Sequence, residues 1–189
     1  TTFIALKQGM FTGQGPDCCG RIEFNSLEVP AKIYASEILS ARRLDWSRQK
    51  TYLHPRQKSM HKGEAGHVLV IGGTPGLSGA VRLAGEAALR SGAGMVTIAT
   101  HADHASLMNI GFPEIMCHGI IRPNDLDPLL ERCSVIAIGP GLGKGVWGRV
   151  IFNSLRETGK PVVMDADALG LLAERSEGYR KRIMTPHPC

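Results

Sequence analysis

Four short segments of the 189-residue sequence carry residue types from which a ligand site could be built. They read GGTPGLSGA at 72–80, GPGLG at 139–143, DAD at 165–167 and TPHP at 185–188. Glycine lets backbone amides approach a ligand closely, carboxylates accept hydrogen bonds, and histidine can donate or accept a proton. Each segment alone is a weak signal, and the two glycine-rich segments would serve equally well as tight turns.

The first segment fails the known nucleotide-binding fingerprints. Its glycines fall at positions 72, 73, 76 and 79, which is not GxGxxG, and no GK[ST] follows. The next strand ends in TIAT and then His101, where an acidic residue would bind a ribose. A ligand could still approach the backbone at the start of the following helix. The residues alone therefore leave a ligand loop and a plain structural turn equally open.

Two carboxylates and one histidine are the polar candidates. Asp165 ends an apolar run and is the better candidate for a functional contact. A helix is expected to begin between the two carboxylates, so Asp167 can be an ordinary negative charge at a helix N-terminus. His187 lies between two prolines, which fix the backbone, and this is unusual for a core histidine. We therefore expect His187 to contact a ligand.

Strands and helices alternate regularly from residue 67 onward. The first helix shows helical spacing, with Ser78 expected as its N-cap, Gly92 at its end, and Arg82 and Glu86 four apart on its polar face. Apolar strands that alternate with helices predict a parallel sheet covered on both faces, whose strand ends would share one ligand-binding edge. Strands are expected near 67–72, 95–100, 134–139, 161–165 and 182–185, and further helices around 102–110, 125–132, 145–158 and 167–175.

The beginning of the chain has a different character. Residues 1–30 contain two strand-like runs, TTFIAL and RIEFNSL, joined by a loop that is too rich in glycine to be helical. Two strands alone expose a whole face, so we expect the closing edge of a domain that packs poorly or lies apart from the later body. The sequence starts without methionine and stops at TPHPC, so we expect a fragment.

The net charge of +5 is concentrated in one stretch. Residues 31–62 hold eight Lys and Arg against two acidic residues, an excess of six, whereas residues 63–189 hold twelve of each sign. No stacking aromatics or binding motif accompany the charge, so a solvated linker is favoured over a nucleic-acid arm. No apolar run approaches the roughly 20 residues of a membrane span, and no signal peptide is visible. Five cysteines without zinc spacing predict no metal site. We expect a cytoplasmic protein that binds neither membranes nor nucleic acid.

Taken in order, the motifs resemble one family. HKGEAGHVLVIGGTPGLSGAVRLAGEAALRSGAGMVTIAT, AIGPGLG, PVVMDADALGLLA and RIMTPHP are similar to the ADP-dependent NAD(P)H-hydrate dehydratases of the ribokinase-like superfamily. The segment TFIALKQGMFTGQGPDCCGRIEF resembles the closing strands of the Rossmann-like NAD(P)H-hydrate epimerases, which in bacteria are fused ahead of the dehydratase. The resemblance implies an epimerase tail at 1–30, a basic linker at 31–60, and the N-terminal part of a truncated ribokinase-like α/β dehydratase domain at 61–189.

The resemblance also implies the chemistry. In this family ADP phosphorylates the hydroxyl group of a hydrated nicotinamide ring, which turns a poor leaving group into a good one and allows NADH or NADPH to be restored. Mg²⁺ would assist the phosphoryl transfer, and K⁺ would serve the epimerase domain. The family's catalytic aspartate and nucleotide motifs follow TPHP, so no catalytic residue is expected in this chain. The substrate-side contacts are expected at Gly73, Gly79, Ala80, Gly141, Gly143, Asp165 and His187.

Two other functions stay open beside the repair of NAD(P)H hydrate. A ribokinase-like small-molecule kinase is one, although HKG together with DADAL and TPHP argues against it. A catalytically inactive, truncated binding fragment is the other, and we expect the 189 residues by themselves to be inactive. The sequence leaves open a homo-oligomer and the preference between NADH hydrate and NADPH hydrate.

Overall fold

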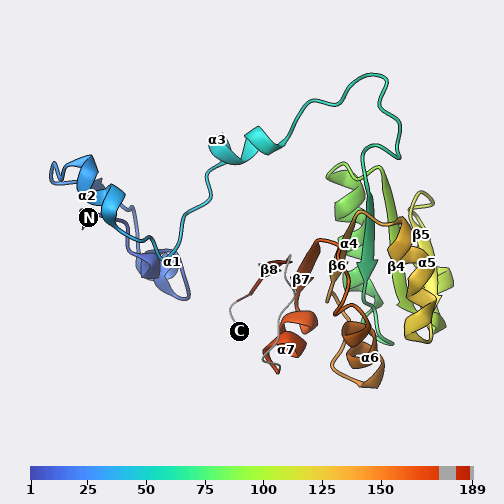
Figure 1. Cartoon of the computed structure of the whole chain (residues 1–189). Helices are drawn as coiled ribbons and strands as arrows, with labels where there is room; N and C mark the ends of the chain where they lie inside the picture. The colour runs from blue at the N-terminus through green and yellow to red at the C-terminus, as the bar shows by residue number, and fades with distance from the viewer. Residues whose placement is uncertain (175–181, 188–189) are drawn as a thin grey trace. The chain divides into compact units, whose positions relative to one another are not determined.

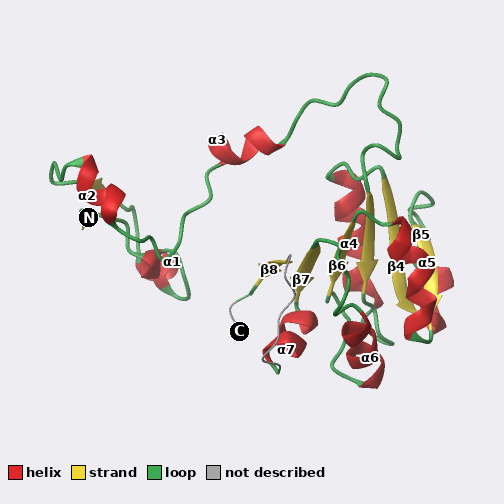
Figure 2. Cartoon of the chain, in the orientation of Figure 1, coloured by secondary structure: helices red, strands yellow, loops and turns green. Residues whose placement is uncertain are grey.

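The computed structural model describes residues 1–174 and 182–187, which divide into two units, Thr1–Arg56 and Gln57–His187. Within these described residues the second unit has a six-stranded sheet, drawn in yellow in Figure 2. Its strands are β3 (His67–Ile71), β4 (Met95–His101), β5 (Met116–Ile120), β6 (Val135–Ile138), β7 (Val162–Asp165) and β8 (Arg182–Thr185). They are all parallel and lie in the order β5-β4-β3-β6-β7-β8.

Different helices cover the two faces of this sheet (Figure 1). Side chains alternate along β3, so Leu69 and Ile71 point to one face and Val70 points to the other. The first face packs against α5 (Asp127–Arg132), α6 (Val146–Ser154) and α7 (Asp167–Ala173), and the second against α4 (Ser78–Arg90). The predicted parallel sheet covered on both faces is therefore confirmed.

The first helix and the strand it follows are close to their predicted bounds. Helix α4 begins one residue early, because Leu77 and not Ser78 is its N-cap, and its C-cap is Ser91. Arg82 and Glu86 do form the predicted pair, with Nε and Oε1 3.1 Å apart. The glycine predicted to end the helix follows one residue after the C-cap, where chain reversal requires its positive φ.

Three other predictions were wrong in detail. Strand β5 was missed, because MCHGI is mostly exposed at the edge of the sheet and pairs only with β4 among the described strands. The helix expected at 102–110 is a 3₁₀-helix, η3 (Ala102–Leu107), and the helix expected at 125–132 begins as the 3₁₀-helix η4 (Pro123–Leu126).

The first unit contains little regular structure. Two-residue strands β1 (Thr2–Phe3) and β2 (Phe24–Asn25) pair in parallel. The intervening loop was expected to be non-helical, but it contains the short helices η1 (Gln8–Met10) and α1 (Gly15–Cys18). Helix α1 has a proline in its first turn, a position that suits proline. Helices α2 (Ala31–Ser36), α3 (Trp46–Gln49) and η2 (Lys50–Tyr52) follow. No helix in the described part of the chain is long and apolar enough to cross a membrane.

One buried polar pair lies at the start of the central strands. His67 is 7% exposed, and its Nε2 lies 2.7 Å from the hydroxyl of Thr97, which is 1% exposed. Burial lowers the pKa of His67, and the positive charge of Arg132 acts in the same direction, while a hydrogen bond to the Arg132 backbone opposes them. The folded chain therefore favours the neutral form of the His67 side chain.

This histidine should make stability depend on pH. Its unfolded pKa is about 6.5, and the folded pKa is lower, so the unfolded chain binds more protons as the pH falls below that value. The free energy of unfolding should therefore decrease from pH 7.5 to pH 5.5, by at most about 1.4 kcal/mol per pH unit for this one site. Urea denaturation at both pH values measures this decrease. His67→Gln should reduce the dependence, whereas His118→Gln, at an exposed position on β5, should not; an equal effect of both would contradict the assignment.

Candidate functional site

The turn after β3 is held by backbone hydrogen bonds to both neighbouring strands. Gly72 N donates to the Ala99 carbonyl at 3.1 Å, on the β4 side. Gly73 N donates to the Pro140 carbonyl at 3.2 Å and Thr74 N to the Gly141 carbonyl at 2.7 Å, on the β6 side. These bonds bring the GGTPGLSGA and GPGLG segments together at the carboxyl ends of the strands, as expected for a parallel sheet. We refer to this side of the sheet as the candidate edge.

Most glycines of these two segments are explained by the protein's own packing. Gly73 has φ +74°, and a Cβ there would lie 2.5 Å from Thr100 Oγ1. Gly141 has φ +61°, and its Cβ would clash with the Leu77 carbonyl. Gly143 has φ +73°, and its Cβ would lie 2.9 Å from the Thr74 side chain. A side chain at any of the three would distort the turn, so their presence alone does not indicate a ligand.

Gly79 and Ala80 differ from those glycines. Both are exposed in the first turn of α4, and a Cβ at Gly79 would meet no atom within 4 Å. The N-cap residue, Leu77, makes no side-chain capping hydrogen bond. The first N–H groups of a helix lack intrahelical partners and attract polar or anionic groups. A ligand can therefore come close to the backbone at the start of α4. Nothing in the protein's packing requires glycine at position 79.

The two carboxylates of DAD act on different neighbours. Asp167, at the start of α7, accepts a 2.8 Å hydrogen bond from Gly143 N through its Oδ2. Asp165, at the end of β7, accepts a 2.7 Å bond from the hydroxyl of Thr185 on β8. Ala166 between them has φ 45° and ψ −119°, a backbone conformation that glycine normally adopts. The contact between Asp167 and the GPGLG loop was not predicted, because a carboxylate in the first helical turn also suits the helix dipole.

His187 also follows the carboxyl end of a strand, but that strand is β8, the outermost of the described strands. It is exposed and follows β8, which is three strands from β3 in the sheet. At about 4.8 Å per strand, the ends of β3 and β8 are roughly 14 Å apart. The structure thus brings Gly73, Gly141, Gly143 and Asp165 into one connected edge, and places His187 at its far end.

Two further residues at this edge were missed from sequence. Thr100, which is 0% exposed, donates from its hydroxyl to the Gly73 carbonyl at 2.9 Å. His104 places Nε2 2.8 Å from the same hydroxyl. Threonine inside an apolar strand and histidine four residues later give no sequence signal that separates them from ordinary core and surface residues.

The described residues contain no preformed cluster of metal-binding side chains. Among residues 1–174 and 182–187, no group of three or more His, Cys, Asp or Glu side chains could hold a metal ion. These residues therefore do not form a magnesium site by themselves.

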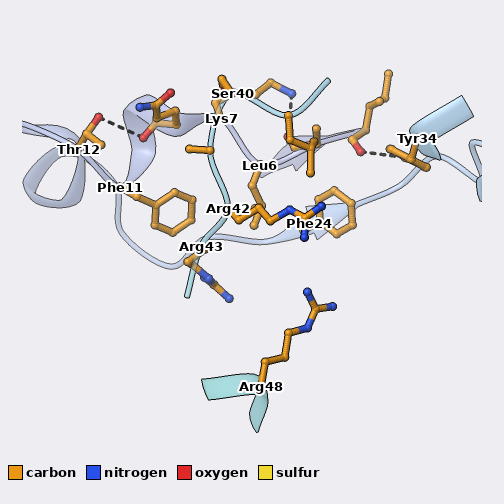
Figure 3. Close-up of a pocket in the computed structure, with 15 residues that line it drawn as sticks. Leu6, Lys7, Phe11, Thr12, Phe24, Tyr34, Ser40, Arg42, Arg43 and Arg48 are labelled. Atoms are coloured by element: carbon orange, nitrogen blue, oxygen red, sulfur yellow. Dashed lines mark hydrogen bonds between the residues drawn. The ribbon is translucent and has the colours of Figure 1, made fainter. Parts of the chain in front are cut away.

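A cavity of about 770 Å³ lies inside the first unit (Figure 3). Apolar side chains such as Leu6 and Phe24 line it, with several cations among them. Lys7 Nζ already donates to the Phe3 and Ala5 carbonyls at 2.7 and 2.9 Å. Most of its lining comes from residues 4–12 and 39–48, and only Phe24 belongs to a strand. None of the four motif segments contributes to it, so we place the candidate site at the sheet edge and not here.

Comparison with a curated relative covers nearly the whole chain. The chain is 44% identical over 187 residues to the bifunctional NAD(P)H-hydrate repair enzyme Nnr of Coxiella burnetii. The match includes 99% of this chain and 38% of that protein, so the chain spans about two fifths of the length of this relative.

Solved structures define the class. A ribokinase-like superfamily protein of Enterococcus faecalis covers 70% of this chain and 49% of its own, with a TM-score of 0.63 and 29% identity. The ADP/ATP-dependent NAD(P)H-hydrate dehydratase of Bacillus subtilis, co-crystallised with ATP and Mg²⁺, covers 70% of this chain and 47% of its own, with a TM-score of 0.56 and 28% identity. The fold of the second unit is thus that of a ribokinase-like α/β protein. The family model for NAD(P)H-hydrate dehydratase matches residues 68–189, and the chain belongs to that family.

Asp167→Ala should loosen the GPGLG loop. The change leaves Gly143 N, in a half-buried position, without its acceptor, and should lower the free energy of unfolding by about 1–3 kcal/mol. Urea denaturation measures the loss. Asp127→Ala is the matched control, because Asp127 also begins a helix but is exposed, and it should cost less than about 1 kcal/mol. Equal losses in the two variants would show that Asp167 acts only on the helix dipole.

Proposed function

We propose that the protein containing this chain dehydrates NAD(P)H hydrate at the expense of ADP or ATP. Family membership supports the reaction, and the relative from Bacillus subtilis is described as ADP/ATP-dependent. The observation that carries the site is the exposed start of α4, where Gly79 is not required by packing and no side chain caps the helix. This region would contact the hydrated cofactor.

The dimensions of the edge suit a nucleotide substrate. A ligand that touches both the turn after β3 and the residues after β8 must extend over roughly 14 Å, the spacing of these two strand ends. A nicotinamide ring alone is too short, whereas a ring with its ribose and phosphate reaches further. We therefore propose that the reacting ring lies against Gly79 and Ala80, and that the more distant part of the cofactor passes Gly141, Gly143 and Asp165 toward His187.

The residues of this chain would bind and orient the substrate. Phosphorylation makes the ring hydroxyl a good leaving group, and this step depends on positioning and charge stabilisation more than on covalent chemistry by the protein. The uncapped amides of α4 would face negative charge on the substrate. By the family resemblance, we assign the nucleotide, Mg²⁺ and the proton-accepting aspartate to segments that follow TPHP.

The first unit fits a second role. The match to the bifunctional relative extends over 99% of this chain and so includes residues 1–56. We propose that residues 1–30 close an epimerase domain that would hold K⁺, that residues 31–60 form the interdomain linker, and that residues 61–189 begin the dehydratase domain. Several large apolar side chains of this unit are exposed, which is expected of a domain edge that needs a partner. A cytoplasmic location and a homo-oligomer are further parts of this proposal.

The proposed reaction can be followed directly by absorbance. The full-length protein should convert NADH hydrate to NADH, seen as growth of the reduced nicotinamide band, only when ADP or ATP and Mg²⁺ are present. We expect the 189 residues alone to give no turnover, because the resemblance assigns the family's catalytic aspartate and nucleotide motifs to segments that follow TPHP. Phosphorylation of a vitamin precursor without any dehydration of the hydrate would identify a related kinase instead.

Gly79→Ala should separate binding from folding. Alanine favours helix over glycine by up to about 1 kcal/mol, and nothing obstructs the new methyl group, so stability should be unchanged or higher. If substrate contacts the backbone there, the KM for the hydrate should rise by about tenfold, equivalent to about 1.4 kcal/mol. Gly159→Ala is the control, since Gly159 is equally open but precedes β7 and lies at the opposite edge of the sheet. An unchanged KM in Gly79→Ala would remove the start of α4 from the site.

A further inference from the structure

His104, Thr100 and the turn after β3 form a continuous chain of contacts. His104 Nε2 lies 2.8 Å from Thr100 Oγ1, which lies 2.9 Å from the Gly73 carbonyl oxygen. A Cβ on Gly73 would lie 3.4 Å from His104 Nε2 as well as 2.5 Å from the threonine hydroxyl. The three residues therefore pack against one another, and any shift of one must move the others.

The direction of the hydrogen bonds follows from the number of hydrogens. A threonine hydroxyl has one hydrogen, and the carbonyl of Gly73 can only accept. If the hydroxyl pointed instead at His104, two oxygen lone pairs would face each other at 2.9 Å in a position that is 0% exposed. Such a repulsive contact between two buried acceptors is costly. Thr100 therefore donates to Gly73, accepts from His104, and requires that His104 carry its proton on Nε2.

The Gly73 carbonyl lies at the centre of the turn that presents the proposed substrate loop. It also accepts from His101 N at 3.2 Å, while Gly73 N and Thr74 N donate to the GPGLG segment. The β6 side of the turn is thus held by backbone hydrogen bonds alone. The β4 side also has two backbone hydrogen bonds, from Gly72 N to the Ala99 carbonyl and from His101 N to the Gly73 carbonyl, and in addition uses one hydroxyl and one imidazole. A change in those two side chains would alter the turn without touching the sheet.

We propose that His104 is a positioning residue for the dehydratase substrate. Through its Nε2–H it holds the Thr100 hydroxyl on the Gly73 carbonyl, and so keeps the turn in the geometry in which the start of α4 receives the hydrated cofactor. This inference rests on the proposed function for its substrate. The tautomer of His104 follows from the contacts alone and can be measured without activity.

Kinetics of the full-length protein test the positioning role. His104→Leu removes the donor and should raise the KM for NADH hydrate by about tenfold, while His104→Gln, which keeps an N–H donor, should stay within about threefold of the parent. The KM for ADP should not change in either variant. Thr100→Val should match His104→Leu, and the double variant should be no worse than the more affected single variant, because both changes remove one relay. Equal damage from Gln and Leu, or additive effects in the double variant, would overturn the proposal.

The protonation site gives a second, independent measurement. In the full-length protein with ¹⁵N-labelled histidine, long-range nitrogen–proton correlations at mildly alkaline pH should show His104 protonated at Nε2, with its signal assigned by its loss in His104→Gln. Protonation at Nδ1 would overturn the relay. Absence of hydrate turnover in the unmodified protein would refute the proposed function, and this tautomer measurement would still decide on the relay.

Discussion

The pairing of β3 with a strand on each side is the constraint on which the rest of the second unit depends. Leu69, Val70 and Ile71 are 0% exposed, so this strand is sealed on both faces as well as along both edges. The chain continues from the carboxyl end of β3 through Gly72 and Gly73. The turn after β3, with its hydrogen bonds to Ala99, Pro140 and Gly141, is consequently fixed relative to this one strand.

The same glycine-rich turn combines two kinds of residue that look alike in the sequence. Gly73 is required by backbone conformation and by the side chain of Thr100. Gly79, six positions later, is surrounded by open space. Gly73 is thus required by the fold, whereas Gly79 leaves space for a ligand. In such a site the turn after the strand is held by the protein's own packing, and only the start of the helix is open to a ligand.

The sheet was predictable because its central strands are buried and therefore form continuous apolar runs, such as HVLVI and SVIAI. Strand β5 was not, since MCHGI is an edge strand with exposed polar residues and no periodic signal. Asp165 was correctly placed at a strand end, but the hydrogen bond from Gly143 to Asp167 joins residues 24 apart and has no local signature. For the same reason the relay of Thr100 and His104 could not be found, because hydrogen-bond direction depends on three-dimensional distances.

The unusual backbone of Ala166 limits how this protein can diverge. Its φ of 45° and ψ of −119° match the first central position of a type II′ turn, which strongly favours glycine. A methyl group is the largest side chain that such a position accepts at modest strain, on the order of 1–3 kcal/mol. Branched or aromatic replacements would force the turn open and separate the strand end from the helix. The junction between β7 and α7 therefore restricts which side chains this one position accepts, while the neighbouring Asp165 and Asp167 are held by hydrogen bonds of their own.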